Sequence, residues 1–172
     1  AFGSGYHATT QLVIEWMEQR LCRGNTVLDV GAGSGILSML AVRLGAASAL
    51  GIDKDPVAIE CARELAAANG FGSELRLRAA SYEDIVAETF DVVLANLDGR
   101  TLPLFCASLP GILRAGGLAC LSGLQPQDYE GIAGALARAG FSITARMERG
   151  EWLALEVRQA CLADGQGNAA RP

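Results

Sequence analysis

Hydrophobic and polar positions along the chain follow two alternating periodicities, which predict strands and helices in turn. Continuous apolar runs at 26–31 and 90–97 are typical of strands that are buried on both faces of a sheet. The stretch 74–80 instead alternates with period two, which favours a strand nearer the edge of the sheet. The predicted strands are 26–31, 48–53, 74–80, 90–97, 118–124, 141–150 and 151–159. The predicted helices are 9–21, 35–45, 55–70, 102–114 and 126–140.

Repeated strand–helix units of this kind predict an α/β fold, in which helices cover both faces of a doubly wound, mostly parallel sheet. Gly150 lies between the last two predicted strands, so we expect a hairpin that adds an antiparallel C-terminal strand. No internal repeat is evident, and residues 1–159 are expected to form one domain. The tail 160–172 is polar and rich in glycine, which predicts disorder.

Composition narrows the classes of function. The chain is 51% hydrophobic, yet no run reaches the roughly 18–20 apolar residues of a membrane span, and no export signal is evident, so we expect a cytoplasmic protein without membrane contact. The net charge of −5 disfavours a protein held to nucleic acid by phosphate contacts and suits a basic protein or amine substrate. One histidine and five separated cysteines without a CxxC pair predict mostly buried free thiols and no metal site. The cysteines are Cys22, Cys61, Cys106, Cys120 and Cys161.

Three glycines at alternate positions, Gly31, Gly33 and Gly35, follow the first predicted strand in the sequence DVGAGSG. In parallel sheets, ligands bind beyond the carboxyl ends of the strands, and glycines there let the backbone approach a ligand closely. The amides that open the next helix would suit a carboxylate or a phosphate. A dinucleotide-binding fingerprint would need its third glycine at position 36, which is Ile36, so the spacing disfavours a nicotinamide cofactor. A tight turn without a ligand is the alternative.

A carboxylate, Asp53, ends the second predicted strand, about twenty residues beyond the first glycine. At that place an acidic side chain accepts hydrogen bonds from the ribose hydroxyls of a bound nucleoside. Asp55 competes for this role, but its position before Pro56 predicts a helix cap. A solvated turn residue is the alternative for Asp53.

Several motifs together resemble a known family. DVGAGSG followed by GIDKDP is similar to class I S-adenosylmethionine-dependent methyltransferases. The opening AFGSGYHATT, the strand end VLANL, the later LSGL and the near-terminal GEW resemble one branch, the PrmA ribosomal protein methyltransferases, from about Ala1 to Val157. The resemblance implies the Rossmann-like class I methyltransferase fold and S-adenosyl-L-methionine as the cofactor.

The resemblance also implies roles for single residues. Those expected to contact the cofactor are Thr10, Gly31, Gly33, Gly35, Asp53 and Asn96. Asn96 would lie where the methyl group emerges, with an amide able to accept from or donate to the incoming amine, and it is the candidate catalytic residue. A turn-forming asparagine is the alternative for Asn96, and a helix cap is the alternative for Thr9 and Thr10. The sequence assigns no definite role to His7, which is expected to be either a surface residue or one that fixes the opening loop. Trp152 is expected to anchor the core rather than to border an amine channel with Glu151.

The expected activity is transfer of methyl groups to amine nitrogens, most naturally lysine or N-terminal amines of a ribosomal protein. Two alternatives stay open: a methyltransferase for a different small-molecule or protein amine, and a degenerate fold that only binds cofactor or a partner. A sulfonium donor needs an unprotonated amine, and a buried pocket beside that cation would lower the pKa of the amine. No Ser-His-Asp or Cys-His arrangement is evident, and alignment of the reactants would not need one.

Three features depart from the pattern of the family. Ser4 stands where threonine is usual, which keeps the hydroxyl. The motif after Asn96 typically continues Ile-Leu-Ala, whereas this chain has Leu-Asp-Gly, so Asp98 and Gly99 are expected to change the substrate-side wall. The family's separate substrate-binding domain precedes the FGSG loop. Because the sequence begins at Ala1 without a methionine, we expect a product cut from a longer precursor or a fragment of one.

Overall fold

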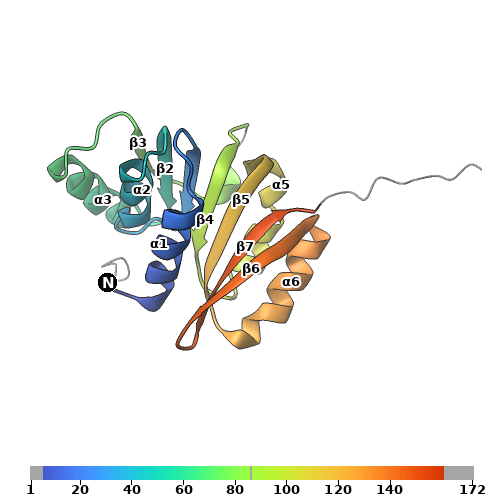
Figure 1. Ribbon diagram of the computed structural model, residues 1–172. Coiled ribbons are helices and arrows are strands. Elements are labelled where there is room, and N and C mark those ends of the chain that lie inside the picture. The colour runs from blue at the N-terminus through green and yellow to red at the C-terminus, as the bar shows by residue number, and fades with distance from the viewer. Residues whose placement is uncertain (1–5, 86, 161–172) are drawn as a thin grey trace, which may run out of the picture.

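The computed structural model describes residues 6–85 and 87–160, which form a seven-stranded sheet with helices on both faces (Figure 1). The strands are β1 (Thr26–Val30), β2 (Ser48–Asp53), β3 (Leu75–Ala79), β4 (Phe90–Asn96), β5 (Leu113–Leu124), β6 (Phe141–Arg149) and β7 (Trp152–Gln159). The α-helices are α1 (Ala8–Arg20), α2 (Ile36–Arg43), α3 (Pro56–Ala68), α4 (Leu102–Cys106), α5 (Leu109–Ile112) and α6 (Tyr129–Arg138). Two short 3-10 helices are η1 (Tyr82–Asp84) and η2 (Pro126–Asp128).

The sheet has the strand order β3-β2-β1-β4-β5-β7-β6. Strands β1 to β5 run parallel to one another, and β7 pairs antiparallel with both β5 and β6. The chain builds outward from β1 to β3 and then returns to place β4 on the other side of β1. The order therefore reverses between β1 and β4, which is where ligands bind in open α/β sheets. The predicted α/β fold, with β3 at an edge and an antiparallel C-terminal hairpin, is confirmed.

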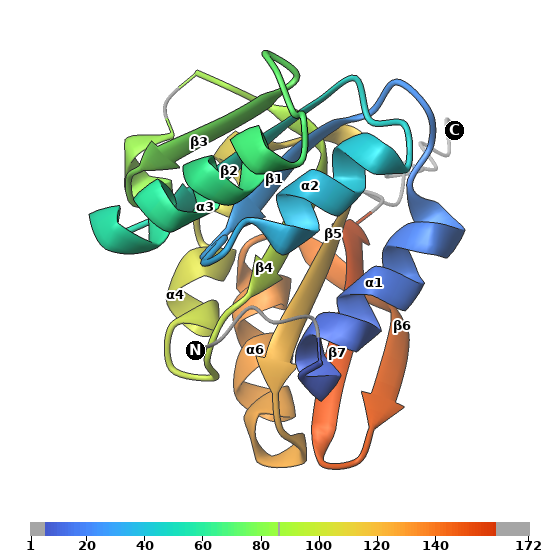
Figure 2. The ribbon, with the colours of Figure 1, turned by 90° about the vertical axis from the view of Figure 1, so that its left-hand side faces the viewer.

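Two apolar cores lie on opposite faces of the sheet. Helices α1, α2 and α3 cover one face, and α4, α5 and α6 cover the other (Figure 2). Neighbouring residues of β1 enter different cores: Val27 packs beneath the first group of helices and Leu28 beneath the second, both fully buried. Because the central strands are covered on both sides, they carry continuous apolar runs rather than an alternating pattern.

The predicted helix 102–114 is wrong in its middle. The structure has two short helices there, α4 and α5, and β5 already begins at Leu113. Pro110 lies in the first turn of α5. In one continuous helix its ring would clash with the carbonyl of Cys106, and it has no N–H to donate. Residues 115–117, which lie between the predicted helix 102–114 and the predicted strand 118–124, fall inside β5, where the pairing with β4 is irregular between Leu113 and Leu118.

The burial of the cysteine thiols differs in part from the prediction. Of the four described thiols, all free, Cys106 and Cys120 are buried but Cys22 and Cys61 are exposed. Cys22 lies in the turn after α1, and Cys61 lies on the solvent-facing side of α3, so neither enters a core. Cys161 and the predicted disordered tail, apart from Ala160, lie outside the described residues.

A buried carboxylate joins α1 to the antiparallel strands. Glu156 of β7 is 2% exposed, and its Oε2 accepts a hydrogen bond from Trp16 Nε1 at 2.9 Å and pairs with Arg20 Nε at 2.7 Å. Its Oε1 accepts from Thr144 Oγ1 at 2.8 Å and lies 3.6 Å from Arg158 Nε. Burial alone would raise the pKa of Glu156, but these donors and cations outweigh it and lower the pKa. The anion therefore holds α1 against β6 and β7.

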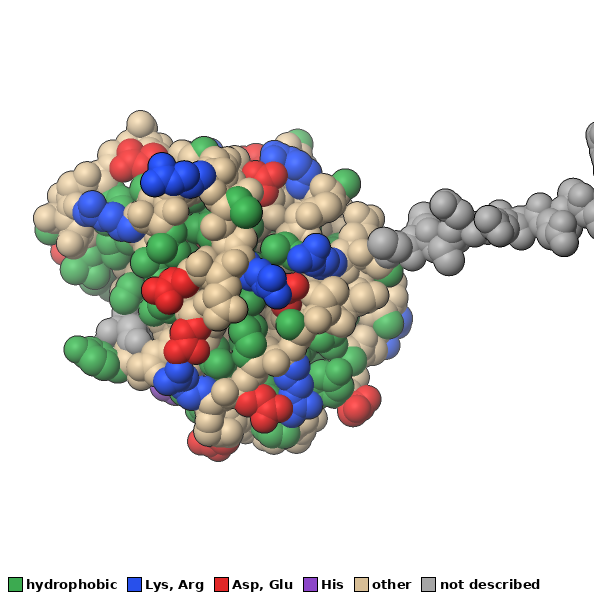
Figure 3. Space-filling model, in the orientation of Figure 1, with side chains coloured by type: hydrophobic (Ala, Val, Ile, Leu, Met, Phe, Trp, Pro, Cys, Tyr) green, Lys and Arg blue, Asp and Glu red, His purple; other side chains and the backbone are tan. Residues whose placement is uncertain are grey.

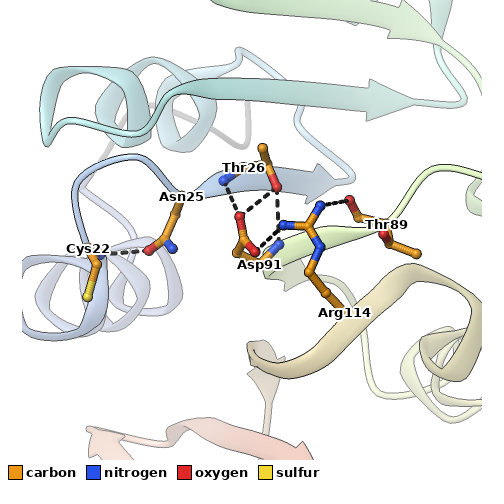
Figure 4. Close-up of polar contacts among 6 residues, drawn as sticks. All are labelled: Cys22, Asn25, Thr26, Thr89, Asp91 and Arg114. Atoms are coloured by element: carbon orange, nitrogen blue, oxygen red, sulfur yellow. Dashed lines mark hydrogen bonds and ion pairs between the residues drawn. The ribbon is translucent and has the colours of Figure 1, made fainter.

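A second polar cluster holds the amino ends of the central strands together (Figure 4). Asp91 of β4 accepts hydrogen bonds from the backbone N–H of Thr26 at 2.8 Å and from its Oγ1 at 2.9 Å. The other carboxylate oxygen pairs with Arg114 of β5, which also donates to the Thr89 carbonyl at 3.2 Å. Burial raises the pKa of Asp91, but the bonds from Thr26 and Arg114 outweigh it, so the pKa is lowered.

We expect Asp91→Ala to lower the free energy of unfolding by about 2–3 kcal/mol at neutral pH, because Thr26 and Arg114 lose their anionic partner. Since the folded-state pKa of Asp91 is lowered, this stabilisation is present above about pH 4 and is lost as the pH falls further. Urea unfolding across this range measures both effects. The control Glu88→Ala removes an exposed ion pair with Arg76 and is expected to cost less than about 1 kcal/mol. Equal losses in the two variants would contradict the prediction.

Candidate functional site

A cavity of about 680 Å³ lies at the carboxyl ends of β1, β2 and β4, where the strand order reverses. This volume is typical of a site for a small molecule. All of the predicted cofactor residues line it except Gly35, which caps α2. The full lining is His7, Thr9, Thr10, Val30, Gly31, Ala32, Gly33, Ile36, Leu37, Ile52, Asp53, Lys54, Ala80, Ser81, Tyr82, Asn96, Leu97, Asp98, Gly99, Thr101, Gly123, Gln125, Asp128 and Trp152.

The glycine turn between β1 and α2 is covered by a side chain from the end of β4. Gly31, Gly33 and Gly35 all have positive φ, at +73°, +53° and +75°. A Cβ on Gly31 would lie 2.5 Å from Leu97 Cδ2, and the Gly31 N–H donates to the Ile52 carbonyl at 2.9 Å. Glycine at position 31 is therefore favoured by its positive φ, and a side chain there would also require Leu97 to move. The neighbour that excludes a side chain there is part of the protein itself.

Asp53 ends β2 and fixes the glycine turn to it. Its Oδ2 accepts the Gly33 N–H at 2.9 Å, and its Oδ1 accepts the Asp55 N–H at 2.9 Å. Each carboxylate oxygen has two lone pairs, so both keep capacity for the hydroxyls of a ligand in the cavity. Asp55 instead caps α3 by accepting the Val57 N–H at 2.9 Å, as predicted, and lies outside the lining.

Two side chains far apart in the sequence meet at the end of β4. Asn96 Nδ2 donates to Thr10 Oγ1 at 3.5 Å, and both residues line the cavity. Thr9 and Thr10 are buried in the first turn of α1, and the cap of that helix is His7, so the alternative that the threonines cap the helix does not hold. Ser122 Oγ of β5 donates to the Thr9 carbonyl at 3.1 Å. The start of α1 is thereby part of the cavity wall.

His7 and Trp152 close one side of the cavity. His7 Nδ1 accepts the Thr9 N–H at 3.4 Å and lies 2.8 Å from Thr9 Oγ1, so the ring fixes the start of α1, which is one of the two roles left open for it. It meets the Trp152 ring edge-on, with the centroids 5.1 Å apart. Trp152 is half-buried and packs against a core, but it also lines the cavity. Glu151 lies outside the lining and accepts a hydrogen bond from Gln125 Nε2 at 3.0 Å.

Sequence reasoning missed three lining residues that carry charge or an aromatic ring. Lys54 Nζ lies 5.5 Å from the centroid of the Tyr82 ring, on the side of the cavity formed by β2 and β3. Both residues follow the carboxyl end of a predicted strand, which is the signal that could have identified them. Asp128 is the last residue of η2, and no motif marks it, because its place in the wall depends on the fold of the segment after β5.

A buried acid lies in β1 beneath the glycine turn. Asp29 is 1% exposed, and its Oδ2 accepts a hydrogen bond from Ser38 Oγ of α2 at 2.7 Å. The described residues give its Oδ1 no partner. Burial raises the pKa of Asp29 to about 6, against the lowering effect of the bonds from Ser38, and the charge of Asp53 adds to the rise. Asp29 lies outside the cavity lining and links β1 to α2.

Comparison with known proteins assigns the family. The sequence matches the family model described as "Ribosomal protein L11 methyltransferase (PrmA)" over residues 1–160. This chain belongs to that family. A ribosomal protein L11 methyltransferase of Cupriavidus pinatubonensis is 44% identical over 137 residues, which are 80% of this chain and 45% of that protein. One of Pseudomonas putida is 39% identical over 159 residues, 92% of this chain and 54% of that protein. The chain thus spans about half the length of these curated relatives.

Solved structures agree with this assignment. The ribosomal protein L11 methylase of Lactobacillus delbrueckii subsp. bulgaricus is 33% identical, with a TM-score of 0.86 over 91% of this chain and 81% of that one. A putative RNA methyltransferase of Pyrococcus horikoshii has a TM-score of 0.75 at 18% identity, over 91% of this chain and 83% of that one, and shows the shared fold alone. The Rossmann-like methyltransferase fold expected from the PrmA resemblance is confirmed.

The described part of the chain was also compared with what a membrane span, a metal site or a patch of like charge requires. Within it, no helix combines the length and the apolarity that crossing a membrane requires. No group of three or more His, Cys, Asp or Glu side chains among the same residues is placed to hold a metal ion. On the face shown in Figure 3, basic and acidic side chains are interspersed rather than gathered by sign.

We expect Asp29→Asn to flatten the dependence of stability on pH between about pH 4 and pH 6. The folded state keeps the Asp29 proton up to about pH 6, whereas the ordinary pKa is 3.8, so wild-type stability falls as the pH rises through this window. Two pKa units correspond to about 3 kcal/mol. Asparagine keeps an acceptor for Ser38 without the charge, so the variant should exceed wild type in stability above the window and match it below. Denaturant unfolding at several pH values tests this, and parallel curves for the two proteins would contradict it.

Proposed function

We propose that this chain transfers methyl groups from S-adenosyl-L-methionine to amine nitrogens, most naturally lysine or N-terminal amines of a ribosomal protein. Membership of the family supports the activity, and the printed names of its relatives support the ribosomal protein as the substrate. The observation that carries the proposal is one cavity that gathers Asp53, the glycine turn, Thr10 and Asn96 from separate parts of the chain. A ribosomal protein substrate also supports the predicted cytoplasmic location.

The residues of the cavity fit an adenosyl ligand with an amino-acid end. The Asp53 carboxylate has lone pairs for ribose hydroxyls, and its position is fixed by two backbone amides. The glycine turn offers backbone without side chains, and the first amides of α2 suit a carboxylate. Thr10 and Asn96 add polar groups to the cavity wall from the start of α1 and the end of β4. When bound, S-adenosyl-L-methionine supplies the methyl group, carried on a sulfonium.

Asn96 is the residue best placed to orient the amine. Its Nδ2 is engaged with Thr10 Oγ1, which leaves its Oδ1 to accept an N–H of the incoming amine. A lysine amine has an ordinary pKa near 10.4, so on the order of one molecule in a few thousand is neutral at pH 7. The apolar walls provided by Leu97 and Trp152 exclude water and lower the pKa of a bound amine. Alignment of the neutral amine then supplies a large part of the rate enhancement.

We expect Asp53→Ala to weaken binding of S-adenosyl-L-methionine about 10- to 100-fold, because hydrogen bonds from the ribose to a carboxylate are lost. The matched control is Asp55→Ala, two residues away, which removes a helix cap outside the cavity. Calorimetry measures the affinities, and thermal unfolding of both variants checks their folding. The proposal fails if wild type binds NAD at micromolar levels and does not bind S-adenosyl-L-methionine.

We expect Asn96→Ala to lower kcat about 100-fold while the dissociation constant of S-adenosyl-L-methionine changes less than about threefold. The reason is that the amide acts on the amine rather than on the cofactor. Mass spectrometry of lysine-containing peptides measures methyl transfer, and calorimetry measures cofactor binding. Equal losses in turnover and in cofactor affinity would refute the placement of Asn96 beside the reacting nitrogen. Tight cofactor binding without transfer to any amine would favour the non-catalytic alternative.

A further inference from the structure

The charges on the cavity wall differ between its two ends. Asp53 and Lys54 are neighbours in the chain at the end of β2, so the lining there carries charges of both signs. Asp98 and Asp128 line the other end, in the segments that follow β4 and β5. Among the described lining residues, no lysine or arginine lies at the end that Asp98 and Asp128 form. This end of the cavity is therefore anionic and attracts positive charge.

Asp98 supplies charge to this end, but its oxygens are already engaged. Its Oδ1 accepts the backbone N–H groups of Arg100 at 2.9 Å and Thr101 at 3.0 Å. Its Oδ2 accepts from Thr101 Oγ1 at 2.9 Å. The bond from the Thr101 hydroxyl is the largest of the effects that lower the pKa of Asp98, so the side chain is an anion at neutral pH.

Asp128 lies directly against bare backbone. A Cβ on Gly99 would lie 2.5 Å from Asp128 Cγ and 2.6 Å from each of its carboxylate oxygens, so a larger residue at 99 would displace the carboxylate. The Gln125 N–H donates to Asp128 Oδ2 at 2.9 Å. The described residues give the carboxylate no second hydrogen bond, so Oδ1 is left for solvent or a ligand.

We propose that Asp128 is a specificity-determining residue, whose carboxylate receives a positive charge of the substrate next to the amine that is methylated. The inference rests on the proposed function, because it concerns the substrate end of the same cavity. The reacting nitrogen itself is not the partner, since a carboxylate beside it would raise its pKa and retain the proton that it must lose. The substrate class is therefore an amine with a second cation close by, such as a lysine within a basic peptide segment.

Two synthetic peptides of equal length test this inference. Each peptide carries one lysine. Arginine flanks the lysine in the first peptide, and citrulline, which is similar in shape but uncharged, flanks it in the second. Fluorescence anisotropy with S-adenosylhomocysteine present measures binding, and mass spectrometry with saturating S-adenosyl-L-methionine measures transfer. We expect wild type to bind the arginine peptide about fivefold more tightly and Asp128→Asn to bind both equally. Asparagine still accepts the Gln125 N–H, so the cap of η2 is kept while the charge is lost.

Two further variants separate charge from local structure. Asp84 caps η1 by accepting the Ser81 N–H at 2.8 Å, in the same manner as Asp128 caps η2, but it lies outside the cavity lining. Asp84→Asn is therefore the matched control and should keep the preference for the arginine peptide. Gly99→Ala should lose the preference, because the new Cβ displaces the carboxylate. Adding Gly99→Ala to Asp128→Asn should change nothing further.

The outcomes distinguish this inference from the proposed function. Equal binding of the two peptides by wild type overturns the inference, and so does a preference that Asp128→Asn retains or Asp84→Asn also loses. A binding preference that depends on Asp128, without methyl transfer to either peptide, supports the inference and contradicts the proposed function. Because an exposed ion pair is screened by salt, the preference should also shrink as the ionic strength rises.

Discussion

Glu156 carries its charge into the interior of the protein, where Trp16 and Arg20 of α1 and Thr144 of β6 surround it. An ionised carboxylate that is 2% exposed is tolerated only where donors and cations replace its water, so each of these contacts constrains the helix. The first turn of α1 carries Thr10, which meets Asn96 at the end of β4. The sheet alone could position the glycine turn, Asp53 and Asn96. The wall that faces them depends on the docking of α1.

Glycines around the cavity allow segments of the protein to approach one another. Leu97 covers Gly31, and the Leu97 carbonyl would lie 2.1 Å from a Cβ on Gly123, which has a φ of +90°. Asp128 lies against Gly99 in the same way. The segments after β1 and β4, the end of β5 and η2 therefore lie close to one another, through side chains at Gly31 and Gly99 and through the backbone at Gly123. Close approach to a ligand accounts for only part of this glycine content.

Features that depend on a place along a strand were predictable from the sequence. Asp53 was predictable because ligands bind beyond the carboxyl ends of parallel strands, and Asn96, at the end of β4, was implied by the family resemblance. Features that depend on contacts between distant segments could not be predicted from the sequence. The sequence near each residue does not indicate that Asp128 packs against Gly99 or that Leu97 packs against Gly31. Pro110 is a local signal against a continuous helix over 102–114, and in the structure it lies in the first turn of α5.

The order of the strands has a consequence for biosynthesis. β7 is the last of the described strands in the sequence, yet it lies between β5 and β6. While a ribosome is still making residues 152–159, the apolar edge of β5 has no neighbour, and β6 has no strand to join. Exposed strand edges of this kind recruit other chains, so the nascent protein is vulnerable to misassembly until β7 has been synthesised. A premature stop shortly before Trp152 would thus remove more than one strand from the sheet. Without β7, the edge of β5 stays unpaired and β6 cannot join the sheet.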